Sequence, residues 1–107
     1  PTSTTMYKTL ISLKAGNAII LSPHPNAKNC ILETFQIINR AAAAAGAPAG
    51  LIQCITVPSQ EGTSALLKHR DIGMILATGG EAMVRQFLYG QRFTQQHLNY
   101  RHLNHQQ

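Results

Sequence analysis

The stretch NAIILSPHPNAK, residues 17–28, changes from a short apolar run to a pair of prolines within a few positions. The apolar run, residues 17–21, is typical of a buried strand. Pro23 and Pro25 end that strand, because proline has no N–H to donate to a sheet. We expect Asn26 to cap a helix that follows. The stretch therefore predicts a strand, a stiff loop and the start of a helix.

A helix is predicted on each side of this stretch. Before it, Thr2-Ser3-Thr4 precedes apolar residues at helical spacing, and Gly16 is a natural stop. After it, a second apolar face continues until Gly46-Ala47-Pro48 breaks the helix. The first face consists of Met6, Leu10, Ile11 and Leu13, and the second of Ala27, Ile31, Phe35, Ile38, Ala42 and Ala45.

The rest of the chain continues the alternation of strands and helices. Residues 51–57 predict a second strand, and Ser59 is expected to cap a third helix that runs to about Lys68. Residues 72–77 predict a third strand, and residues 78–80 turn into a helix near Glu81. Strands joined by helices need crossover connections, which give a parallel sheet with helices on its faces. The predicted fold class is α/β.

Composition limits the function classes. A chain of 107 residues with 44% hydrophobic and 12% charged residues is expected to fold as one small domain. We place that domain at residues 1–90, with a polar tail rich in Gln and His at residues 91–107. The nine Lys and Arg residues are scattered singly, which argues against nucleic-acid binding despite a net charge of +5. With neither a long apolar run nor a leader, a cytoplasmic protein is expected.

The cysteines and histidines do not predict a metal site. Cys30 and Cys54 show no CxxC spacing, so we expect small buried thiols, with one disulfide as the alternative. The tail histidines, His97, His102 and His105, are not spaced like a set of metal ligands.

Three loops are expected to share the carboxyl edge of the predicted sheet, where ligands of such folds bind: residues 22–26, 58–60 and 78–80. Ser22 and His24 are able to hydrogen-bond ribose hydroxyls, or they form a rigid strand exit with a solvent-facing histidine. Gly79 and Gly80 allow close backbone approach before a helix, so this turn is either an anion site or purely structural.

Four segments resemble CoA-acylating aldehyde dehydrogenases in order and spacing, over roughly residues 1–85: PTSTT (1–5), NAIILSPHPNAK (17–28), AGAP (45–48) and ILATGG (75–80). This family includes acetaldehyde dehydrogenases and the aldehyde half of bifunctional aldehyde-alcohol dehydrogenases. The resemblance implies a Rossmann-like, three-layer nucleotide-binding domain, here incomplete, that binds NAD. It implies that Ser22, Pro23, His24 and Pro25 lie along the adenosine ribose, and that Thr78, Gly79 and Gly80 lie near the pyrophosphate.

The resemblance also implies a second domain whose cysteine forms a thioester that coenzyme A collects. Neither Cys30 nor Cys54 matches that nucleophile, so we expect no catalytic residue in this chain, weak or lost NAD binding, and no acylating activity of the chain alone. After Arg85 the sequence departs from the family pattern, which suggests a truncated or out-of-frame product. The alternative function is a noncatalytic, self-associating interaction module, with a homo-oligomer as one form.

Overall fold

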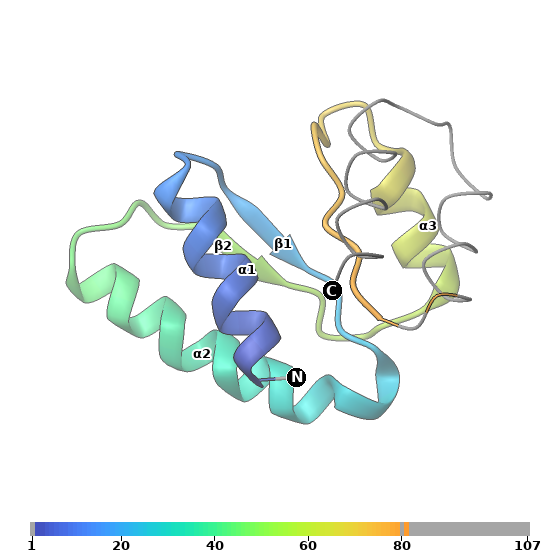
Figure 1. Ribbon diagram of the computed structural model, residues 1–107, viewed down its shortest axis with the longest axis horizontal. Helices are drawn as coiled ribbons and strands as arrows, with labels where there is room; N and C mark the ends of the chain where they lie inside the picture. The colour runs from blue at the N-terminus through green and yellow to red at the C-terminus, as the bar shows by residue number, and fades with distance from the viewer. Residues whose placement is uncertain (1, 80, 82–107) are drawn as a thin grey trace. The chain divides into compact units, whose positions relative to one another are not determined.

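The computed structural model describes residues 2–79 and Glu81, and the chain divides between Gln60 and Glu61 into two compact units. Three α-helices, one short 3-10 helix and two strands form in these residues (Figure 1). In chain order they are α1 (Thr2–Lys14), β1 (Ile19–Leu21), η1 (Pro25–Ala27), α2 (Lys28–Ala44), β2 (Ile52–Cys54) and α3 (Gln60–Lys68).

Glycine ends both long helices of the first unit, as the sequence predicts. Gly16 has a φ of 82° and donates its N–H to Leu13, while Asn17 donates to Ser12. The same pair of bonds ends α2, where Gly46 has a φ of 95°. This is the Schellman arrangement, which needs a left-handed residue that only glycine adopts without strain.

The two strands form a parallel pair. Ile19 lies opposite Ile52 and Leu21 opposite Cys54. The connection between β1 and β2 runs through η1 and α2, which is the crossover that a parallel pair requires. The predicted α/β class with a parallel sheet is therefore confirmed, although the sheet in the described residues has only two strands.

Both helices of the first unit pack on the same face of the sheet. α1 contacts β1 and α2 contacts β2, and the two helices also contact each other (Figure 1). Leu21 and Ile52 are buried on that face and form the apolar core, whereas Ile20 and Gln53 are exposed on the opposite face. The core is small because one layer of helices covers one side of a narrow sheet.

The second unit differs from the prediction in one element. α3 ends at Lys68 as expected, but residues 72–78 have no regular secondary structure, so the predicted third strand is wrong. A strand exists only where its backbone pairs with a neighbour, and an apolar run predicts burial rather than pairing. Glu81 is helical, while the rest of that predicted helix and the tail, residues 91–107, lie outside the described residues. None of the described helices is long and apolar enough to cross a membrane.

Candidate functional site

The loop that leaves β1 combines one buried proline with exposed neighbours. Pro23 is buried, whereas Ser22, His24 and Pro25 are exposed. Pro23 thus fixes the loop to the core, and its own fixed φ limits the movement of the residues beside it. The loop presents polar groups from a rigid backbone at the end of the strand.

A backbone hydrogen bond orients the His24 imidazole. His24 is extended, with φ −63° and ψ 140°, and its Nδ1 accepts the N–H of Asn26 at 3.1 Å. Its carbonyl accepts the N–H of Ala27 at 2.9 Å. An imidazole nitrogen that accepts a hydrogen bond carries no proton, so the neutral ring holds its proton on Nε2. His24 therefore offers a donor on its outer nitrogen.

The capping prediction for Asn26 is wrong. Asn26 lies inside η1, and the residue that caps this turn is His24. Ala27, which has no side-chain acceptor, occupies the N-cap position of α2. Asparagine is common at N-cap positions, because the oxygen of its short side chain can accept a free backbone N–H of the first turn. Here a 3-10 turn begins at Pro25, one residue before the expected cap, so Asn26 lies inside that turn.

The parallel register brings the residues after β2 to the same edge as this loop. The N–H of Ile55 donates to the carbonyl of Leu21 at 2.9 Å, so the two chains remain paired where both strands end. The second predicted loop, residues 58–60, comes next in the chain, and in it Pro58 is half-buried and Ser59 is exposed. Val57 is 76% exposed, an apolar side chain in the segment that leaves this edge. The sequence does not predict this exposure, because Val57 is the last residue of the apolar strand predicted at residues 51–57.

The third predicted loop belongs to the second unit. Thr78 is half-buried, and Gly79 is exposed with a φ of 145°, a conformation that residues with a Cβ rarely adopt. The backbone there requires glycine, as expected of a turn with close backbone approach. Gly80 lies outside the described residues, so a common rim of all three loops stays a prediction.

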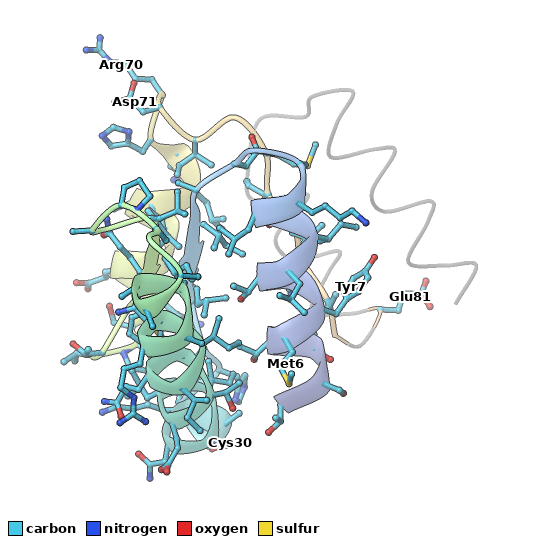
Figure 2. The ribbon with its side chains drawn as sticks, turned by 90° about the vertical axis from the view of Figure 1, so that its left-hand side faces the viewer. Met6, Tyr7, Cys30, Arg70, Asp71 and Glu81 are labelled. Atoms are coloured by element: carbon cyan, nitrogen blue, oxygen red, sulfur yellow. The ribbon has the colours of Figure 1, made fainter. Side chains whose placement is uncertain are left out.

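Both cysteines are free, and the expectation of two buried thiols is wrong for Cys30. Cys30 is exposed on α2, and its Sγ lies 3.0 Å from Oγ1 of Thr2, at the start of α1 (Figure 2). Cys54 is half-buried in β2, where desolvation raises the pKa of its thiol and keeps it protonated. Within residues 2–79 and Glu81, no three His, Cys, Asp or Glu side chains group as metal ligands.

One lysine of α1 also has a shifted pKa. Lys8 is half-buried, and its desolvation lowers the pKa of its amine to about 8. Lys8 is partly enclosed because it lies beside Thr5 and Thr9 on α1, and both threonines are buried. The shift bears on folding stability rather than on the loop after β1.

Comparisons with known proteins agree with the resemblance seen in the sequence. The family model described as "Aldehyde dehydrogenase family" matches residues 1–99. The bifunctional aldehyde-alcohol dehydrogenase AdhE of Escherichia coli (strain K12) is 55% identical over 85 residues, which are 79% of this chain and 10% of that protein. The acetaldehyde dehydrogenase (acetylating) EutE of Salmonella typhimurium is 34% identical over 84 residues, 78% of this chain and 18% of that protein.

Solved structures extend the agreement to the fold. A probable aldehyde dehydrogenase from Listeria monocytogenes EGD-e matches with a TM-score of 0.79 and 59% identity, over 84% of this chain and 20% of that one. An acetylating aldehyde dehydrogenase from Geobacillus thermoglucosidasius matches with the same TM-score and coverage at 49% identity. The chain thus spans between a tenth and a fifth of the length of these relatives. On the family model, the relatives and the fold together, the chain belongs to the aldehyde dehydrogenase family.

Proposed function

We propose that this chain forms part of the NAD-binding domain of a CoA-acylating aldehyde dehydrogenase, an enzyme that oxidises an aldehyde to an acyl-CoA. Membership of the family and the names of the relatives, which include an acetaldehyde dehydrogenase (acetylating), support the reaction class. We assign no catalytic residue to this chain, and the aldehyde and coenzyme A are contacted by other parts of the enzyme. NAD supplies the hydride acceptor, and the residues described here bind and orient it.

One observation carries the proposal: the fixed imidazole of His24 at the carboxyl edge of the parallel pair. Because Nδ1 accepts the N–H of Asn26, the Nε2–H points away from the backbone and is able to donate to a ribose hydroxyl. Ser22, two residues earlier, adds a hydroxyl on the same loop, and Pro23 and Pro25 limit the motion of both. A ligand therefore meets donors that are already ordered, which lowers the entropic cost of binding.

The exposed side chain of Val57 supports the same site. Nucleotide sites need an apolar surface for the base beside polar groups for the sugar, and Val57 follows the strand that pairs with β1. In this proposal Val57 contacts the adenine, while Ser22 and His24 contact its ribose. The turn at Thr78, Gly79 and Gly80 belongs to the second unit, and its assignment to the pyrophosphate is supported separately, by the resemblance to CoA-acylating aldehyde dehydrogenases. At Gly79 the φ of 145° favours a residue without a Cβ.

A pair of histidine variants tests the proposal. His24→Ala removes the ribose donor and the local bond to Asn26, whereas His69→Ala removes a bond of the same kind, because Nδ1 of His69 accepts the N–H of Asp71 at 3.1 Å. We expect His24→Ala to weaken NAD binding about two- to tenfold, the equivalent of one hydrogen bond, and His69→Ala to leave it unchanged. Titration of the full chain with NAD, followed by NMR, measures both.

The two variants separate a binding role from a structural one. Loss of local backbone order in both variants reports only the missing turn bond. Equal NAD affinities for His24→Ala and His69→Ala would show that His24 makes no hydrogen bond to the ribose. NADP is titrated in parallel, and the ratio of the two affinities measures which nucleotide the loop prefers.

A further inference from the structure

Two histidines of the chain close the same kind of turn. Nδ1 of His24 accepts the N–H of Asn26 at 3.1 Å, and Nδ1 of His69 accepts the N–H of Asp71 at the same distance. In each case the carbonyl of the histidine also accepts the N–H of the residue three positions later, at 2.9 Å in the first turn and 3.1 Å in the second. We name these the His24 turn and the His69 turn. Both depend on an imidazole nitrogen that carries no proton.

A second proton on the imidazole removes the bond from Nδ1. Neutral imidazole has one acceptor nitrogen, whereas imidazolium carries a proton on both nitrogens and accepts no hydrogen bond. Histidine is the side chain whose charge changes between about pH 5 and about pH 8. His24 and His69 are both exposed, so protons reach them without any opening of the fold. The two turns differ in what they offer to imidazolium.

The His69 turn has a carboxylate beside the ring. Oδ2 of Asp71 lies 3.8 Å from Nδ1 of His69. The other carboxylate oxygen of Asp71 lies 4.0 Å from Nε of Arg70, so one acid serves two cationic groups (Figure 2). A protonated Nδ1 donates to this carboxylate in a charge-assisted bond, which is stronger than a bond between neutral groups. Protonation thus exchanges one bond between His69 and Asp71 for another.

The His24 turn has no carboxylate in the same place. In the part of the chain that the structure describes, His24 forms no ion pair, and its partner Asn26 bears a neutral amide. The turn leads into η1, which contacts α2, and the charged residues of α2 are Lys28, Glu33 and Arg40. The first of these in the chain is a cation, and the N–H groups at the start of a helix also repel positive charge. Imidazolium at position 24 therefore lacks an anion to replace the lost bond.

We infer that the His24 turn is a proton-sensitive latch on the loop after β1. Neutral His24 closes the turn, and protonated His24 releases the N–H of Asn26, so that the loop and the start of η1 lose order. The His69 turn stays closed over the same pH range, because Asp71 holds its imidazolium. One consequence rests on the proposed function: acid loosens the loop that we assign to the ribose and so weakens NAD binding. The latch itself requires no nucleotide.

Solvent-exchange NMR of the full chain without NAD tests the latch. The imidazole ¹⁵N signals report the protonation of each ring. The amides of Ala27 and Ile72, which donate to the carbonyls of His24 and His69, report whether each turn is closed. From about pH 8 to about pH 5, we expect the exchange rate of Ala27, corrected for its intrinsic pH dependence, to rise about fivefold, the equivalent of one hydrogen bond. The corrected rate of Ile72 should change less than about twofold.

Reciprocal variants exchange the two behaviours. Asn26→Asp gives the His24 turn a carboxylate where the His69 turn has Asp71, so the rise at Ala27 should disappear. Asp71→Asn removes the carboxylate from the His69 turn, so the amide of Ile72 should now exchange faster in acid. His24→Asn is the control that does not titrate, because an asparagine oxygen accepts the same N–H at every pH.

Two results would overturn the inference. The first is a constant corrected rate at Ala27 while the ¹⁵N signals show that His24 is protonated. The second is an equal rise at Ala27 in the wild type, Asn26→Asp and His24→Asn, which would assign the change to general loosening of the chain in acid. Because these measurements contain no NAD, a failed latch leaves the proposed nucleotide site standing, and a failed NAD titration leaves the latch standing.

Discussion

Replacement of Thr9 by valine should stabilise the first unit. Thr9 is fully buried on α1, and its Oγ1 has no hydrogen-bond partner within the part of the chain that is described. Valine has the same shape and nearly the same helix propensity, but a methyl group stands where threonine has its hydroxyl. The substitution therefore changes the polarity of one enclosed atom and little else.

The size of the effect follows from that atom. Burial of a hydroxyl without a partner costs about 1–3 kcal/mol in proteins, and part of this cost is already offset by relaxation around the site. We expect Thr9→Val to raise the free energy of unfolding by about 1–2 kcal/mol. Each 1 kcal/mol corresponds to a rise in Tm of roughly 4–8 °C for a small domain, which thermal and urea unfolding followed by circular dichroism will detect.

Thr34 provides the matched control. It is also buried in a helix, but its Oγ1 donates to the carbonyl of Cys30 at 2.8 Å. Thr34→Val loses that bond, so it should give no gain and a loss of up to about 1 kcal/mol. If Thr9→Val destabilises the chain as much as Thr34→Val does, the hydroxyl of Thr9 has a partner and the reasoning is refuted.

Two further predictions concern single residues. Lys8→Met should stabilise the chain at pH 7, because desolvation lowers the pKa of this amine to about 8 from 10.5. Between pH 8 and pH 10.5 the folded chain binds fewer protons than the unfolded chain, so the free energy of unfolding of the wild type rises with pH. Urea unfolding should therefore show that the stability difference between Lys8→Met and the wild type becomes smaller over this range. A stability difference that stays constant with pH would contradict the lowered pKa of Lys8. Gly79→Ala should destabilise the chain by about 1 kcal/mol because of its positive φ, whereas Gly73→Ala, without a positive φ and with open space for a Cβ, should not. Equal melting temperatures of Gly79→Ala and Gly73→Ala would show that a Cβ at position 79 causes no backbone strain.

The sequence predicts the helix boundaries well because glycine and proline act locally. Gly16 and Gly46 end helices through their own backbone freedom, and the structure has both where the pattern predicts them. The parallel pair follows from the alternation of elements, since a helix between two strands leaves them parallel. These predictions depend on residues that are close to one another in the chain, so a local sequence pattern is enough to make them.

Predictions that depend on distant residues were less reliable. Periodicity identified an apolar face of α1, but it did not predict that Met6, Leu10 and Ile11 of this face are exposed while Thr5 and Thr9 are buried. The apolar run at residues 72–77 says nothing of a pairing partner, and no third strand forms. Burial and pairing are decided by other segments, whose positions the local pattern does not contain.

The candidate site was predicted in part. The prolines identified a stiff loop after β1, and the rigid geometry of His24 agrees with that. The tautomer of His24 was beyond prediction, because it depends on one backbone hydrogen bond from Asn26. The exposure of Val57 was also missed, since a valine beside Pro58 has the composition of a strand end whether it faces the core or solvent.

Binding of a dinucleotide at the loop after β1 is the central claim about this protein, and one titration tests it directly. NAD is added to the isotope-labelled full chain up to millimolar concentration while backbone and imidazole NMR signals are recorded. We predict saturable shifts of Ser22 and His24, including the Nε2 signal, together with shifts in the turn at residues 78–80. Unchanged signals at Ser22 and His24 over the whole range would contradict the proposed site.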